Sequence, residues 1–86
     1  MSYTVEYKPS SLEDLKQLNR QIQSRIIKKI IWVAENFEDI EPLTLSANLA
    51  GTYKLRVGDY RIIYEFNEVD ENITILKIGH RSEIYG

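Results

Sequence analysis

Three basic side chains cluster around a two-residue turn, and their chemistry is that of a phosphate-binding site. The dipeptide Gly58-Asp59 is typical of a tight β-hairpin, because glycine adopts the positive φ that such a turn requires. Lys54 and Arg56 precede the turn and Arg61 follows it, and a two-residue loop makes Arg56 the cross-strand partner of Arg61. Alternation along the strands then predicts that the three cations share one face.

Two arginines directly opposite each other in a sheet repel, so an anion in front of this face would stabilise it. This argument favours a phosphate-binding face. The alternative is a solvated outer face whose cations are neutralised by a neighbouring acid.

The residues before this hairpin show two kinds of periodicity. Alternating apolar and polar residues predict a first strand over residues 3–8. Apolar residues at helical spacing then predict two helices with a break at residues 19–21. Ser10, with Glu13 three residues later, forms a capping-box signature for the first helix. Together the two helices predict a helical hairpin with one apolar face.

The rest of the chain completes a small α+β domain. Residues 38–52 contain Pro42 and Gly51 and are predicted to be a loop that includes at most a turn of helix. Three strands are predicted after it, at residues 53–57, 60–67 and 72–79. The order β-α-α-β-β-β predicts a single domain, residues 1–86, in which a helical hairpin packs on one face of a small, mostly antiparallel sheet.

The composition excludes several kinds of chemistry. The 86-residue chain contains no cysteine and one histidine, which excludes disulfides, thiol catalysis and cysteine-ligated zinc, so we expect no metal and no cofactor. The net charge of −2 is not that of a strongly basic nucleic-acid binder. No apolar run is long enough to span a bilayer, and the first ten residues do not resemble a signal peptide. We therefore expect a cytoplasmic protein without a membrane partner.

The charges are nevertheless distributed unevenly, and local fields decide where a phosphate binds. A second basic cluster lies in the predicted helical hairpin, within ten residues that contain no acid: Arg20, Arg25, Lys28 and Lys29. These side chains are candidates for contacts with RNA, and a solvated helix face is the alternative.

Two segments of the chain resemble a known family. Residues 49–64, LAGTYKLRVGDYRIIY, and residues 78–85, IGHRSEIY, are similar to motifs of the RelE/ParE superfamily of bacterial and archaeal toxins. The resemblance covers essentially the whole chain. RelE-type members are ribosome-dependent endoribonucleases that cut mRNA in the A site and are inhibited by a co-expressed antitoxin. The resemblance therefore implies a cognate antitoxin, the ribosome with its rRNA, and mRNA as partners.

The resemblance also implies a catalytic site at individual positions. The positions that match the motif of RelE-type toxins are Lys54, Arg56, Arg61, Arg81 and Tyr85. In such a site the 2′-OH of the mRNA attacks the adjacent phosphate, and preorganised cations stabilise the negative charge that develops. Tyr85 would stack on a base or orient the phosphate.

A related branch of the superfamily, which resembles YoeB, uses a glutamate and a histidine, and Glu41 and His80 match them. Histidine changes its protonation state near neutral pH and suits proton transfer, whereas Lys54 would have to lose a proton among other cations. For Glu41 the alternative role is a loop acid, and for His80 it is a hydrogen-bonded residue at a strand end. The two catalytic schemes remain open.

Three functions are compatible with the resemblance. The first is an mRNA interferase, the second is a ParE-like gyrase inhibitor on the same fold, and the third is a non-catalytic module that binds an antitoxin. The cations Lys54, Arg56 and Arg61 favour the first, because gyrase inhibition does not require them as a catalytic set. The chain departs from the family in its slightly acidic net charge, and we expect no helix after its last strand.

Overall fold

The computed structural model describes residues 2–44 and 51–85, without the side chains of Thr44 and Tyr85. In chain order the elements are β1 (Thr4–Tyr7), α1 (Pro9–Lys16), α2 (Arg20–Glu35), the 3-10 helix η1 (Phe37–Asp39), β2 (Leu43–Thr44), β3 (Tyr53–Val57), β4 (Tyr60–Asn67), β5 (Asn72–His80) and α3 (Arg81–Tyr85). The predicted α+β class and the β-α-α-β-β-β order are confirmed. The predicted loop is wrong in part, because β2 forms within it, whereas η1 agrees with the turn of helix that the prediction allowed. Residues 45–50 of the loop lie outside the described part.

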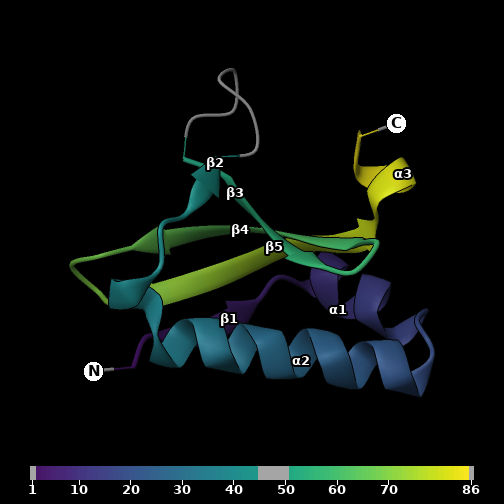
Figure 1. Cartoon of the computed structure of the whole chain (residues 1–86), viewed down its shortest axis with the longest axis horizontal. Coiled ribbons are helices and arrows are strands. Elements are labelled where there is room, and N and C mark those ends of the chain that lie inside the picture. The colour runs from purple at the N-terminus through teal and green to yellow at the C-terminus, as the bar shows by residue number, and fades with distance from the viewer. Residues whose placement is uncertain (1, 45–50, 86) are drawn as a thin grey trace.

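Within the described residues, the sheet has five strands in the order β1-β5-β4-β3-β2 (Figure 1). β1 runs parallel to β5, and every other neighbouring pair is antiparallel. The strand that the sequence did not predict, β2, has two residues, which is too few to show the alternation that identifies a strand. It pairs with the first two residues of β3. The rest of β3 therefore forms an edge of the described sheet.

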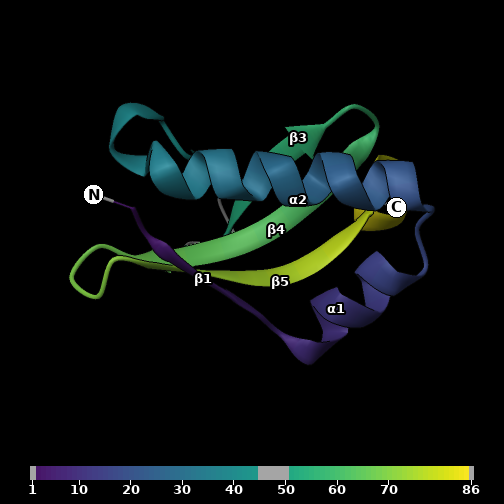
Figure 2. The ribbon, with the colours of Figure 1, turned by 90° about the horizontal axis from the view of Figure 1, so that it is seen from below.

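The helices lie on both faces of the sheet. Figures 1 and 2 show α1 and α2 together on one face and α3 on the other. Residues of α2 at helical spacing, Ile26, Ile30 and Val33, are buried against Ile62 and Tyr64 of β4. Burying a large apolar side chain stabilises a fold by about 1.5–3 kcal/mol. The face of the sheet that packs against α2 is therefore part of the hydrophobic core. The other face carries α3 at one end of the sheet.

The two long helices begin in different ways. Lys8 is the N-cap of α1 and makes no side-chain cap, because Pro9 already has the φ that the first helical position needs. The predicted capping box at Ser10 is therefore wrong, and the Ser10 hydroxyl donates instead to the carbonyl oxygen of Leu76 at 3.0 Å. Asn19 caps α2 with its side chain, which confirms the predicted break between the helices. None of the helices in the described residues is long and apolar enough to cross a membrane.

Candidate catalytic face

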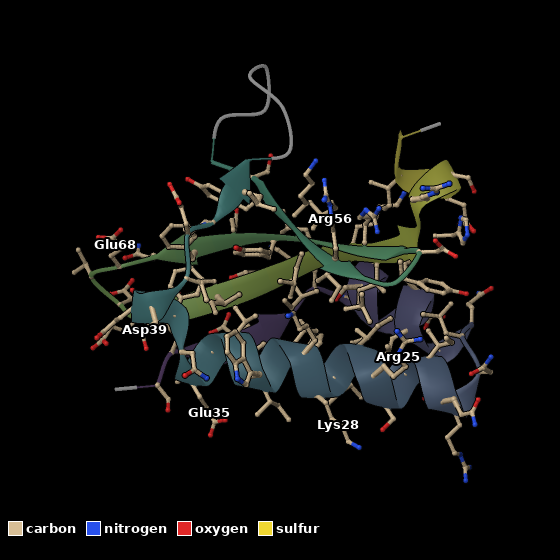
Figure 3. The ribbon with its side chains drawn as sticks, in the orientation of Figure 1. Arg25, Lys28, Glu35, Asp39, Arg56 and Glu68 are labelled. Carbon is tan, nitrogen blue, oxygen red and sulfur yellow. The ribbon has the colours of Figure 1, made fainter. Side chains whose placement is uncertain are left out.

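The hairpin formed by β3 and β4 has the predicted register. Arg56 pairs with Arg61 and Lys54 pairs with Ile63, so the three basic residues lie on the same face, which we call the cationic face. Gly58 in the turn has a φ of 57°, a conformation that costs other L-residues roughly 1–2 kcal/mol. Arg56 is exposed and points to the side of the sheet away from α2 (Figure 3).

Arg61 has a different environment from its cross-strand partner, because its side chain is only 8% exposed. Its Nη1 donates hydrogen bonds of 2.9 Å to the carbonyl oxygens of Gly58 and of Tyr60. Its Nε is buried without a hydrogen-bond partner among the described residues. No carboxylate in the described part of the chain forms an ion pair with Arg56 or Arg61. The two carbonyl groups of the turn therefore stabilise the charged guanidinium of Arg61 and keep it close to the turn.

The C-terminal helix α3 lies against this hairpin, and the expectation that no helix follows the last strand is wrong. The backbone N–H of Arg81 donates to the carbonyl oxygen of Asp59 in the turn at 2.8 Å. Ile84 packs over Gly79, where an added Cβ atom would lie 3.4 Å from the Ile84 Cδ1. Gly79 is the cross-strand partner of Arg61 on β5. Both contacts hold α3 over the cationic face. In the sequence, the signal for this packing was Gly79, whose lack of a side chain leaves room for Ile84.

Two residues of the predicted site are carried by α3. Arg81 is the first residue of the helix, and its side chain is exposed. Tyr85 is the last residue of the helix, and its side chain lies outside the described part of the structure. The structure thus brings Arg81 to the same turn as Arg56 and Arg61.

His80 lies on the other face of the sheet. It pairs with Tyr60, and the two rings are in contact, with centroids 5.6 Å apart and planes at 82°. Tyr60 packs against the core beneath the helices, one residue before Arg61 in an alternating strand. His80 lines a pocket together with Asp14 of α1 and with Leu18, which follows that helix. The structure therefore does not bring His80 together with the cationic face.

Glu41 lies in a pocket of about 230 Å³ between α2 and the edge of β3. Lys54 and Arg56 line the same pocket, so the structure brings Glu41 together with two of the basic residues. Glu41 precedes β2 and His80 ends β5, three strands away and roughly 14 Å at the usual strand spacing. The glutamate and histidine of the second scheme are thus not neighbours.

Tyr64 also lines this pocket. Burial, and to a smaller extent Tyr53, raises the pKa of Tyr64 to about 12.

The basic cluster of α2 does not form a single patch. Arg25 reaches the hairpin turn, since a Cβ atom on Gly58 would lie 3.2 Å from its Nη2. The Lys29 ammonium lies 5.2 Å from the centroid of the Trp32 ring and lines the pocket that contains Glu41. Lys28 points away from the sheet (Figure 3). Arg20, at the start of α2, is exposed.

Comparison with known proteins identifies the family. A family model described as "ParE toxin of type II toxin-antitoxin system, parDE" matches residues 5–85. The chain belongs to this ParE toxin family, within the RelE/ParE superfamily. The toxin is 33% identical over 89 residues to toxin RelG of Mycobacterium tuberculosis (strain ATCC 25618 / H37Rv). This alignment covers 99% of this chain and 98% of RelG.

Solved structures agree with this assignment. The RelBE2 toxin–antitoxin complex of M. tuberculosis contains a chain that matches the toxin with a TM-score of 0.83 and 25% identity, over 95% of this chain and 94% of that one. A mutant of E. coli toxin RelE in the free state has the same fold, with a TM-score of 0.79 and 21% identity over 99% and 92% of the two chains. The resemblance drawn from residues 49–64 and 78–85 is confirmed, and the relatives indicate a toxin of the RelE type.

Proposed function

We propose that this toxin is an endoribonuclease that cleaves mRNA in the A site of the ribosome. One observation carries the proposal: the hairpin makes Arg56 and Arg61 direct cross-strand partners, and the hydrogen bond from the Arg81 N–H to Asp59 anchors a third arginine at the same turn. Lys54 lies on the same face. This concentration of cations suits a phosphate whose negative charge grows during the reaction.

The residues have different roles in the proposed reaction. The 2′-OH of the mRNA attacks the adjacent phosphate, and the leaving 5′-oxygen departs from the opposite side. Arg56 and Arg81, both exposed, bind the phosphoryl oxygens, while Arg61 supplies a charge that the turn carbonyls hold in place before RNA binds. Of the two candidates for proton transfer, Glu41 shares a pocket with Lys54 and is our candidate base for the 2′-OH.

Binding to the ribosome depends on cations outside the hairpin. We assign contacts with rRNA to the basic residues of α2, namely Arg20, Arg25, Lys28 and Lys29. Arg25 reaches the hairpin turn, Lys29 lines the pocket and Lys28 points away from the sheet, an arrangement that suits the irregular phosphate backbone of folded rRNA better than a single groove. Each phosphate contact makes the affinity more sensitive to salt, so binding to the ribosome should weaken steeply as ionic strength rises.

A cognate antitoxin is the other proposed partner, since the M. tuberculosis relative was solved in a toxin–antitoxin complex. The pocket at the edge of β3 is the surface that we assign to it. Trp32 and Leu43 line this pocket and are each 49% exposed, beside the cations Lys29, Lys54 and Arg56. An antitoxin segment with apolar anchors and acidic neighbours would bury the two apolar side chains and cover the cations that bind mRNA.

The test is an inducible growth assay followed by mapping of mRNA 5′ ends, together with cleavage of mRNA on purified translating ribosomes. Expression should arrest growth and produce cuts at a regular position within codons. The double variant Arg56→Ala/Arg81→Ala should abolish the cuts, because both side chains are exposed and the fold does not need them. Lys16→Ala, an exposed cation on α1 far from the cationic face, should cut like the wild type.

Three results would refute the proposal. If gyrase cleavage complexes accumulate without mRNA cuts, the protein is a ParE-like gyrase inhibitor. If the antitoxin binds but expression does not arrest growth, the protein is a non-catalytic binding module. If the Arg56→Ala/Arg81→Ala variant cuts mRNA as fast as the wild type, the site is elsewhere.

A further inference from the structure

We propose that His80 is a positioning residue that caps α3 and holds Arg81 over the cationic face, and that it does not transfer protons. This inference rests on the proposed endoribonuclease activity of that face. It is motivated by the unexpected place of His80, on the opposite face of the sheet from Lys54 and Arg56.

The hydrogen bonds of the imidazole define its state. The Nδ1 of His80 accepts a hydrogen bond from the backbone N–H of Ser82 at 3.2 Å and lies 2.9 Å from the Ser82 hydroxyl oxygen. A backbone N–H can only donate, so Nδ1 carries no proton and the hydrogen of the neutral ring is on Nε2. In this state neither nitrogen is free to act as a base: Nδ1 is occupied and Nε2 is protonated.

His80 is also in the position of a helix N-cap. It directly precedes α3, and Ser82, whose N–H it accepts, is the second residue of that helix. The first backbone N–H groups of a helix have no partner within the helix, and an N-cap side chain normally satisfies the N–H of the second or third residue. The N–H of Arg81, the first residue, donates to Asp59. The hairpin turn and His80 therefore satisfy the first two N–H groups of α3.

A helix of five residues is too short to be stable alone, so its position depends on these anchors. The contacts that attach α3 to the sheet include Ile84 on Gly79, the Arg81 N–H on Asp59, and the cap from His80. The ring that makes the cap is itself held in place by its edge contact with Tyr60. Loss of the cap would let the first turn of α3 move, and Arg81 with it.

The cap requires an unprotonated Nδ1, because a protonated ring nitrogen cannot accept the Ser82 N–H. Tyr60 on β4 is in ring contact with His80, and Asp14 on α1 and Glu83 on α3 line the same pocket as His80. The carboxylate of Asp14 already accepts the backbone N–H of Ile78 at 3.0 Å.

Three substitutions separate positioning from proton transfer. In His80→Asn the amide oxygen takes the place of Nδ1 and can accept the Ser82 N–H, but the side chain cannot shuttle protons. In His80→Gln the oxygen takes the place of Nε2, and His80→Ala removes the acceptor altogether. The readouts are the single-turnover rate of mRNA cleavage on ribosomes and the hydrogen-exchange protection of the Ser82 amide in the free protein.

We expect His80→Asn to keep the cleavage rate within about twofold, because Asn is among the preferred N-cap residues. We expect His80→Ala and His80→Gln to lower both the rate and the Ser82 protection by roughly 2- to 30-fold, the effect of losing one N-cap.

Two results would overturn the inference: an inactive His80→Asn variant that keeps Ser82 protected, or full protection of Ser82 in His80→Ala. A wild-type protein that cuts no mRNA would refute the proposed function instead, and the exchange measurements would still decide whether His80 caps α3.

Discussion

Replacing Arg61 by methionine in one variant and Arg56 by methionine in another tests how the hairpin accommodates two cations directly opposite each other. The residues are cross-strand partners of the same type, but Arg61 is 8% exposed with two hydrogen bonds to carbonyl oxygens, whereas Arg56 is exposed. Methionine keeps most of the aliphatic volume and removes the guanidinium. The two variants therefore isolate the hydrogen bonds of the buried cation.

The expected magnitude follows from these contacts. A hydrogen bond that involves a charged group contributes about 1.5–3 kcal/mol, so the two bonds of Arg61 set an upper limit of roughly 3–6 kcal/mol. Removing a buried Nε that has no partner in the described residues offsets part of this loss. We expect Arg61→Met to lower the free energy of unfolding by about 1–3 kcal/mol, and Arg56→Met to change it by less than about 0.5 kcal/mol.

The assay is urea unfolding followed by circular dichroism, with the slope m checked to be the same for both variants and the wild type. For a domain of this size, each 1 kcal/mol corresponds to a shift of roughly 4–8 °C in Tm, which gives a second measurement. Equal destabilisation by the two substitutions would refute the reasoning, because it would mean that the carbonyl groups of the turn do not hold Arg61. Both variants should also cut mRNA more slowly, since both remove a cation from the proposed site.

Three further predictions concern the turn, α3 and the core. Gly58→Ala should lower the free energy of unfolding by roughly 1–2 kcal/mol, measured by urea unfolding, because φ is 57° and the new Cβ meets Arg25 at 3.2 Å. Gly79→Ala should cut mRNA like the wild type, whereas Gly79→Val should displace Ile84 with α3 and slow cleavage about 10- to 100-fold, with urea unfolding as the control for folding. The pKa of Tyr64 is raised from 10.0 to about 12, so the folded state holds this proton more tightly and is destabilised as pH rises from 10 to about 12. Tyr64→Phe should therefore lose less of its unfolding free energy across that interval than the wild type, and an equal loss would contradict the assignment.

The sequence determined the elements that depend on local patterns. The Gly58-Asp59 turn and strict alternation placed Lys54, Arg56 and Arg61 on one face, and the structure has that register. Helical spacing likewise predicted the face of α2 that is buried. Such patterns are readable because a strand or helix repeats its side-chain direction every few residues.

Contacts between distant segments were decided by the tertiary structure alone. The burial of Arg61 depends on β5 and α3 as well as on its own hairpin, and no periodicity encodes that packing. The same is true of Glu41, which shares a pocket with Lys54 only because the chain returns along β3. His80 shows the limit most clearly: the resemblance to the YoeB-like branch suggested a catalytic role, but alternation along β5 puts its ring on the opposite face from the cations. Adjacent residues of a strand point to opposite sides, so only the pairing of β4 with β5 could decide that Gly79 lies opposite Arg61 and His80 opposite Tyr60.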